Sequence, residues 1–444
     1  MKLEHRIVLK WLLFLFLIYY CTIFETILGS LICYPTMLLI LIGVINGKVT
    51  SSKLGRILFV YLLYSLIATI LLYIFKYNFS DAHLLFVQGI SQVLLGYAVF
   101  WGVILINKDK GALVRNLNLF LLIGFCMILS YLLFPLIPDS VLDILAVSKR
   151  VYEGEGAIGY RYLFPGYDMM QFTAVYFFLY TLFQKKVKVS YYVGAFLGIL
   201  AVLITLTRSL WAGFFFSIGA YWFFNTTAKK KLITICMLIT LLVPLHFALR
   251  SSGYYQGIIE RALSTKEETT DVSGMAKSSV AHRIFEYYAG LETWKENPII
   301  GIGYLMPYRE YFPLIDRYVP TTNSAGVEIA RTYIENAYLQ VLVYQGLIGL
   351  LLLLYLLYVF FAKLKDAKNI QDDHLRVIQK NLIYSFIAIV AGTALSGIDY
   401  SIWQDTIVIG FIMGFVESIS LLEKTQVEKR LSGLGSILPE TVVS

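Results

Sequence analysis

The feature that most limits how this chain can fold is a series of apolar runs, each about 20 residues long, joined by short basic connections. The mean hydropathy is +0.71, and 58% of the 444 residues are hydrophobic whereas only 15% are charged. Soluble globular chains have about 45–50% apolar and about 25% charged residues. The composition therefore excludes a soluble enzyme, a disordered protein and a coiled coil, and it predicts one integral membrane domain over residues 1–444.

A helix that crosses a bilayer needs about 20 mostly apolar residues, and on that rule the sequence predicts an all-α polytopic membrane protein with about 12 transmembrane helices. The predicted spans cover residues 7–24, 27–45, 56–76, 84–106, 113–136, 167–184, 190–206, 209–224, 231–249, 336–360, 381–399 and 403–421. The first run has basic flanks like those of a signal peptide. It lacks a small-residue cleavage site, so we expect it to be retained as a span.

Lys and Arg residues gather in alternate connections, which orients the chain. Seven short segments hold 23 of the 37 Lys and Arg residues. These segments are 1–10, 46–56, 107–115, 184–188, 225–231, 361–380 and 422–444. Because short basic segments stay in the cytoplasm, we expect a multi-pass cell-membrane protein with both termini cytoplasmic and 422–444 as a cytoplasmic tail. The net charge of +8 then reflects topology, and no nucleic-acid partner is expected.

Two longer segments, 137–165 and 250–332, fall on the outer side in this topology. The second separates spans nine and ten, and an irregular loop of that length usually carries function or a small fold of its own. Within it, 279–297 has apolar residues at the i, i+3, i+4, i+7 spacing, which predicts an amphipathic helix lying on the membrane surface. Gly301 and Gly303 then predict a turn.

The sequence contains no phosphate-binding glycine loop, no nucleophile elbow and no zinc-protease motif. Its five histidines are scattered over both sides of the predicted membrane, and its four cysteines all fall inside apolar runs. Neither pattern favours a metal site or a disulfide framework. We therefore expect no metal and no cofactor.

Polar residues at the outer ends of spans are the candidates for chemistry. Arg208 stands between two apolar helices with no loop to hold it in water, and a charge there is costly unless it meets a counter-ion or a wet cavity. A planar, permanently charged guanidinium suits diphosphate oxygens. The structural alternative is an Arg208 side chain that reaches the lipid headgroups.

Arg161, Arg283 and Glu335 are the other outer-side candidates. The two arginines could bind an anion or simply contact headgroups. Glu335, at the outer mouth of span ten, could act as a general base if its carboxylate is partly desolvated. Its structural alternative is a solvated acidic residue at a helix start.

Four sequence blocks occur in a fixed order: RYLFPGYDMMQF, TRSLWAG, HRIFEYYAGLETWKENPIIGIGY and ENAYLQVLVYQGLIGL. Together they are similar to the O-antigen ligase and Wzy-type polymerase superfamily, over about residues 150–360. The last two blocks are the most specific, with an Arg, a Trp eleven residues later, an NPIIGIG turn and an ENAYL helix start.

The resemblance implies a GT-C-like, metal-independent glycosyltransferase that uses undecaprenyl-diphosphate-linked oligosaccharides on the outer face, with inversion at the anomeric carbon. It implies that Arg208 and Arg283 hold the departing diphosphate and that Glu335 is the base. The implied diphosphate- and glycan-binding residues are Arg161, Asn336, Tyr338 and Trp294. A chain-length regulator and a flippase of the same pathway would be partners.

The superfamily leaves two enzymatic activities open. Ligases of this superfamily carry a His-Asn pair where this chain has Glu335-Asn336, and this departure favours a polysaccharide polymerase over a ligase. A flippase or transporter is the alternative from another class. Transporter halves related by a parallel repeat would show a two-fold hydropathy repeat with a long central inner loop, and here the connection after span six is short.

Overall fold

The computed structural model describes residues 3–22, 52–76, 83–137, 148–154, 157–163, 166–184, 187–205, 207–225, 279–303, 334, 336–395 and 402–435, with isolated positions at 42, 227, 229, 232–233, 235–236 and 240. The helices are α1 (Leu3–Thr22), α3 (Lys53–Lys76), α4 (His83–Ile106), α5 (Lys110–Leu133), α7 (Tyr167–Phe183), α8 (Val189–Ile204), α9 (Arg208–Asn225), α12 (Ser279–Glu296), α14 (Ala337–Asp366), α15 (Asp373–Leu395) and α16 (Ile402–Gly435). The 3-10 helices η1 (Phe134–Leu136) and η4 (Ala367–Asn369) follow α5 and α14. This predominantly helical architecture is the one that the apolar runs predict.

Among the described residues, four helical segments are long and apolar enough to cross a membrane: Lys53–Leu72, Lys110–Leu136, Ala337–Asn369 and Asp373–Ala394. Leu94–Ile106 and Val189–Ile204 are shorter apolar helices. Ten predicted spans coincide with described helices, whereas most of 27–45 and of 231–249 lies outside the described residues. Several membrane-spanning helices are therefore present by length and composition, and the total of twelve stays a prediction.

Helix α15 lies at the centre of the bundle and contacts α7, α9, α14 and α16. Its side chains Leu382, Ile383 and Phe386 are buried. The approach to α9 is close enough that a Cβ on Gly213 would lie 2.3 Å from the carbonyl oxygen of Ala388. Small residues permit such backbone approach between membrane helices, and α15 thereby fixes the relative position of its neighbours.

The described part of the chain contains one two-stranded sheet, which the all-helical expectation did not include. Strands β1 (Ser148–Gly154) and β2 (Ala157–Leu163) pair antiparallel, within the predicted outer segment 137–165. Their sequences, SKRVYEG and AIGYRYL, contain β-branched and aromatic residues, and only two residues separate them. Two residues is the commonest length of a hairpin connection, so local sequence explains the difference.

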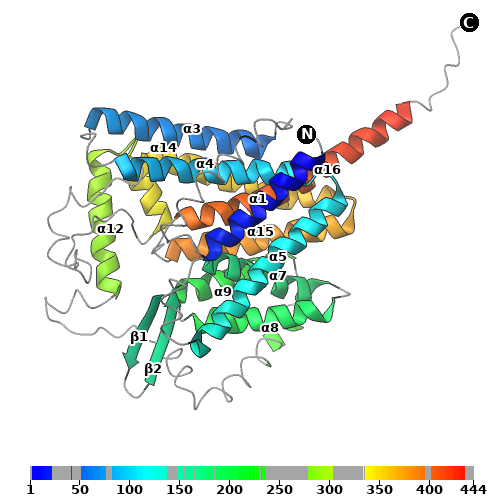
Figure 1. Ribbon diagram of the computed structural model, residues 1–444, viewed down its shortest axis with the longest axis horizontal. Coiled ribbons are helices and arrows are strands. Elements are labelled where there is room, and N and C mark those ends of the chain that lie inside the picture. The colour runs from blue at the N-terminus through cyan, green and yellow to red at the C-terminus, as the bar shows by residue number, and fades with distance from the viewer. Residues whose placement is uncertain are drawn as a thin grey trace, which may run out of the picture.

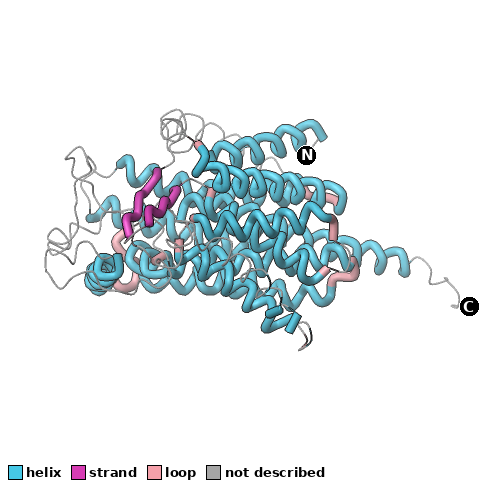
Figure 2. Tube along the Cα trace, turned by 90° about the horizontal axis from the view of Figure 1, so that it is seen from below, coloured by secondary structure: helices cyan, strands magenta, loops and turns pink. Residues whose placement is uncertain are grey.

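The two ends of the bundle are unlike. Helix α12 and the hairpin lie at one end, and the start of α1 and the end of α16 lie at the other (Figures 1 and 2). The predicted topology requires this separation of the two loop-bearing segments from the two terminal helix ends. Which end faces the outside stays a prediction. The predicted tail 422–444 begins as a continuation of α16, which runs to Gly435.

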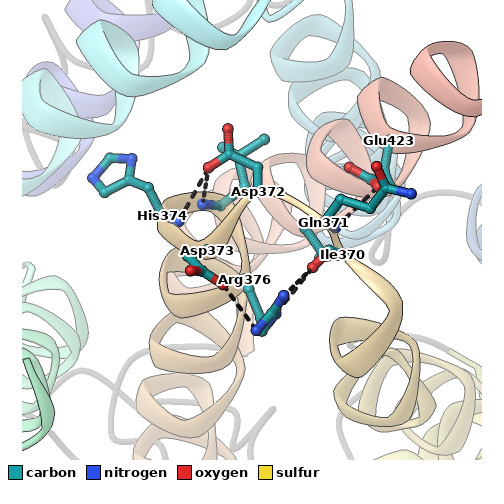
Figure 3. A network of polar contacts seen from close by, with 8 residues as sticks. Ile370, Gln371, Asp372, Asp373, His374, Arg376 and Glu423 are labelled. Atoms are coloured by element: carbon teal, nitrogen blue, oxygen red, sulfur yellow. Dashed lines mark hydrogen bonds and ion pairs between the residues drawn. The ribbon is translucent and has the colours of Figure 1, made fainter.

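Ion pairs and hydrogen bonds hold the end of the bundle where α14 gives way to α15 (Figure 3). Lys110 at the start of α5 pairs with Asp372, and Lys363 Nζ lies 3.1 Å from Oε2 of the buried Glu417. Partial burial by itself would raise the pKa of Asp372. Hydrogen bonds from Lys110 and from the backbone N–H of Leu375 outweigh that effect, so the pKa is lowered.

Candidate active site

Arg208 is the first residue of α9, and only residues 205–207 separate it from the end of α8. The connection is fixed by two donors to the carbonyl oxygen of Val202: Thr205 Oγ1 at 2.7 Å and Trp211 Nε1 at 2.8 Å. The side chain of Arg208 lies outside the described part of the structure. Its backbone stands at a helix N-terminus, where the helix dipole adds partial positive charge to the charge of the side chain.

Helices α7 and α9 meet α15 beside Arg208. Gln171 of α7 donates from Nε2 to the carbonyl oxygen of Leu210, in the first turn of α9, at 2.9 Å. A Cβ on Gly392 of α15 would lie 3.6 Å from both Gln171 Oε1 and the carbonyl oxygen of Ser209. The first turn of α9 is therefore fixed between α7 and the last turns of α15.

Helix α14 starts against another side of the same α15 segment. Asn336 Nδ2 donates to the carbonyl oxygen of Ala394 at 3.0 Å, and Tyr338 Oη donates to that of Val390 at 3.3 Å. Residues 390 and 394 are four apart, so they lie on one side of α15, whereas Gly392 lies on another. The start of α9, which carries Arg208, and the start of α14, which follows Glu335, therefore lie on two sides of the last turns of α15.

Asn336 is also the N-cap of α14. Its backbone is extended, with φ −158° and ψ 114°, and its Oδ1 accepts the backbone N–H of Leu339 at 2.9 Å. An Asn at this position satisfies one of the free N–H groups of a helix start. Glu335, the expected base, lies outside the described residues, but its neighbours Asn336 and the buried Ile334 are described.

The predicted amphipathic helix at 279–297 is confirmed as α12 (Ser279–Glu296). It packs on α14: a Cβ on Gly290 would lie 2.9 Å from Ile334 Cδ1 and 3.5 Å from Leu339 Cδ2. Arg283 is seven residues earlier, which places its Cα about 20° from the same side of the helix. The Arg283 side chain lies outside the described part. The placement of α12 on the membrane surface stays a prediction.

The turn that follows α12 in the chain packs against the middle of α14. Gly301 and Gly303 have φ values of 74° and 97°, which confirms the predicted turn. It lies against Gly346, whose φ of 65° and ψ of −168° break α14. The predicted span 336–360 is therefore not one continuous helix, because only a glycine readily adopts this conformation and a helix cannot continue through it.

Arg161 lies on β2, and its Cα partner in the register is Arg150 on β1. Directly opposite residues of an antiparallel pair share one face of the hairpin, and like charges placed there are unfavourable unless they are compensated. The side chains of both residues lie outside the described part. The structure brings Arg161 toward α7 through the short connection 164–166, and it shows no direct link to the ends of α9 and α14 within the described residues.

Sequence reasoning missed four residues that shape this region: Arg150, Gln171, Gly346 and Gly392. Gln171 had a readable signal, because an amide inside an apolar run needs a partner. The role of Arg150 depends on strand register, and the roles of the two glycines depend on which backbone approaches them. The roles of Arg150, Gly346 and Gly392 therefore could not be predicted from a local sequence pattern.

The site combines positive helix starts with hydrogen-bond acceptors and donors at one end of the bundle. Within the described residues, no three His, Cys, Asp or Glu side chains come together as metal ligands. On α12, the hydrogen bond from Lys295 to Glu292 raises the pKa of Lys295, and the charge of this lysine is paired with that carboxylate. The partial positive charge of the helix starts at this end of the bundle is suited to an anionic group.

Residues 193–354 match a family model, Wzy_C, which is described as O-antigen ligase. No protein among the curated ones matches the chain. The matched segment runs from α8 into α14. It contains all of the candidate residues except Arg161, which lies before it.

Proposed function

We propose, from the match of residues 193–354 to the O-antigen ligase family model, that this chain is a polysaccharide polymerase. The family implies glycan transfer from a lipid-linked donor in a membrane. The specific proposal is that the chain joins undecaprenyl-diphosphate-linked repeat units on the outer face of the cell membrane. A chain-length regulator and a flippase of the same pathway are the proposed partners.

One structural observation supports the proposal above the others. The first turn of α9, which begins at Arg208, and the start of α14, next to Glu335, lie against the same end of α15. The two groups that a displacement at a sugar diphosphate needs, a cation for the leaving group and a base for the acceptor, are thus carried by elements fixed to one another. The match to the family model covers both elements.

The proposed reaction is a direct displacement with inversion. The acceptor hydroxyl attacks the anomeric carbon, its proton passes to the Glu335 carboxylate, and the bond from the anomeric carbon to the diphosphate oxygen breaks with its electron pair on that oxygen. Arg208 and Arg283 neutralise the charge that builds on the diphosphate, and stabilisation of developing charge by such fixed groups is commonly the largest single contribution to catalysis. Arg161, Asn336, Tyr338 and Trp294 remain proposed diphosphate- or glycan-binding residues.

A ligase activity is the second candidate, because the matching family model is described as O-antigen ligase. A ligase would transfer the finished glycan to a different acceptor. The carboxylate at position 335, where ligases of the superfamily carry histidine, favours the polymerase. The two activities differ in their product, because only a polymerase lengthens the donor glycan by whole repeat units.

The test uses purified protein in lipid with an undecaprenyl-diphosphate oligosaccharide from the native host, and the products are resolved by size. We expect a ladder of repeat-unit multiples from the wild type. Arg208→Ala and Arg283→Ala should each lower the rate by about 10²–10³-fold, as the removal of one group that stabilises a transition-state anion does. Arg56→Ala is the matched control, because Arg56 lies near the start of α3, where the neighbouring Gly55 packs on Trp101 near the end of α4.

Each outcome of this test has a distinct meaning. A full ladder from both arginine variants would contradict the diphosphate role. Movement of the lipid-linked sugar across the bilayer without any ladder would replace the enzyme with a transporter. Transfer to an added acceptor without a ladder would establish the ligase.

A further inference from the structure

The break in α14 at Gly346 leaves backbone groups that an unbroken helix would pair. Helices that end inside a bilayer must find partners for these groups within the protein, because lipid offers none. The residues before the break, 337–345, are called the outer part of α14 here after the predicted topology, and the residues after it, 347–366, form the longer part. The partners of the break therefore determine where the outer part is held.

The turn that follows α12 supplies those partners. The backbone N–H groups of Ile302 and Gly303 donate to the carbonyl oxygens of Val343 and Tyr344 at 2.9 and 3.0 Å. In the opposite direction, the N–H of Leu347 donates to the carbonyl oxygen of Pro298 at 2.9 Å. A further bond joins Ile348 N–H to Ile299 O at 3.3 Å. The turn and the break thus form a junction of four backbone hydrogen bonds.

Two glycines make this approach possible. A Cβ on Gly301 would lie 2.5 Å from the carbonyl carbon of Tyr344, and a Cβ on Gly346 would lie 2.1 Å from the carbonyl oxygen of Ile299. From a third element, Tyr64 Oη of α3 donates to the carbonyl oxygen of Gln345 at 2.7 Å. The junction is therefore a close backbone contact that side chains at either glycine would prevent.

Trp294 anchors the junction to α12. Its Nε1 donates to the carbonyl oxygen of Pro298 at 3.0 Å, so this oxygen accepts both Trp294 and the N–H of Leu347. The turn also starts on Trp294, because the N–H of Asn297 donates to the Trp294 carbonyl oxygen at 3.0 Å. The indole N–H of Trp294, in the last turn of α12, and the N–H of Leu347, the first residue after the break, thus share one acceptor.

We infer that Trp294 is a positioning residue, whose indole N–H fixes α12 against the outer part of α14. This inference rests on the proposed function, since α12 carries Arg283 and the outer part of α14 follows Glu335. Gly290 and Trp294 are one turn apart, so the packing of Gly290 on α14 and the hydrogen bond of Trp294 to Pro298 hold the same turn of α12. The distance between the diphosphate-binding arginine and the base would then depend on the junction. Small misplacements of reacting groups are costly, with about 1 Å costing about 10²-fold in rate.

The test separates this role from stacking of the Trp294 ring on a sugar. Trp294→Phe keeps an aromatic face but removes the N–H donor, and Trp294→Leu removes both. If Trp294 acts by positioning and not by stacking on a sugar, we expect both variants to lose at least about tenfold in kcat, with the donor KM within about twofold of wild type, because the proposed diphosphate-binding arginines are kept and only their geometry is disturbed. Thr293→Val is the matched control: it removes a buried hydrogen bond within α12, from Thr293 Oγ1 to Ala289 O, without touching the junction.

A second readout does not depend on the reaction. Hydrogen exchange should show faster exchange over 343–350 in both Trp294 variants than in wild type or Thr293→Val. Unchanged exchange there, or wild-type kcat in Trp294→Phe with a loss confined to Trp294→Leu, would overturn the inference. If the wild type transfers no glycan at all, the proposed function fails, and the exchange data still decide whether Trp294 holds the junction.

Discussion

Asn336 uses both ends of its side-chain amide on the protein: Oδ1 caps α14 at Leu339 N–H, and Nδ2 reaches the carbonyl oxygen of Ala394 in α15. Tyr338 likewise donates to the carbonyl oxygen of Val390. The sequence predicts substrate-binding roles for these residues from motif resemblance, and those roles stay predictions. Their observed contacts join two helices at the point where the chain enters α14, directly after Glu335.

Two substitutions of Asn336 should distinguish the effect of its helix cap from the effect of its hydrogen bond to α15. Asn336→Ser keeps a capping oxygen but cannot reach Ala394, whereas Asn336→Ala loses both contacts. We expect similar, severalfold losses of kcat in both variants, and a lower stability of Asn336→Ala than of Asn336→Ser by about 1 kcal/mol. Thermal unfolding and the ladder assay measure the two quantities.

The control for this series is a cap at the other end of the bundle. Asp109 caps α5 by accepting the N–H of Ala112 at 2.8 Å. Asp109→Ala should lose about 1 kcal/mol of stability and keep the wild-type rate. A wild-type rate in Asn336→Ser would show that the link to Ala394 has no part in the reaction.

At the scale of elements, two helices show what pattern can and cannot predict. Apolar periodicity located α12 almost to the residue, but the side that meets α14 carries the small Gly290, whereas Tyr288 and Leu291 are exposed. Continuous hydropathy predicted α14 as one helix, and Gly346 breaks it. Periodicity measures where apolar side chains recur, and it does not report which neighbour they face or where a second backbone interrupts the helix.

Gly346→Ala should damage the fold more than any effect of helix propensity would suggest. Its φ and ψ lie in a region that is essentially restricted to glycine, and the new Cβ would lie 2.1 Å from Ile299 O. We expect a loss of about 3 kcal/mol or more, or failure to accumulate in the membrane. Gly219→Ala in α9 is the control, because its Cβ would meet nothing within 4 Å. It should be neutral or stabilising by up to about 1 kcal/mol.

The measurement for this pair is thermal unfolding in detergent together with the amount of protein inserted. Equal behaviour of the two variants would mean that the break at Gly346 does not depend on the close approach of Ile299.

At the scale of the whole molecule, the functional candidates and the polar network occupy opposite ends. The starts of α9 and α14 meet the end of α15, α12 and the hairpin lie at that end (Figure 1), and the pairs Lys110–Asp372 and Lys363–Glu417 hold the other. Alternating basic connections predict this polarity, because positive segments stay on the cytoplasmic side. In the predicted topology, the end that carries the functional candidates would face the proposed extracytoplasmic substrate.

Labelling from outside should report which end faces which compartment. In a background without Cys21, Cys33, Cys126 and Cys236, Glu296→Cys at the exposed end of α12 should react with a membrane-impermeant maleimide in intact cells. Glu428→Cys, exposed in α16, should react only after the cells are permeabilised. The reverse pattern would invert the topology and place the proposed site in the cytoplasm.

The sequence by itself determined the helical membrane class, the positions of ten described helices, the surface-type helix at 279–297 and the turn at Gly301 and Gly303. These features depend on local hydropathy, spacing and backbone preference, all of which are encoded within a few turns of chain. The order of the four motif blocks also predicted a resemblance to the superfamily, and the O-antigen ligase family model matches residues 193–354, which contain three of the four blocks.

Only the tertiary structure decided how those elements meet. The contact of Asn336 with Ala394, that of Gln171 with Leu210, the pairing of Arg150 with Arg161 and the junction at Gly346 each join residues that are distant in sequence or lie in different strands. Their formation depends on which backbone groups are left unpaired when helices pack in a medium without water. Which groups are left unpaired depends on the arrangement of all the helices, and a local sequence pattern does not predict that arrangement.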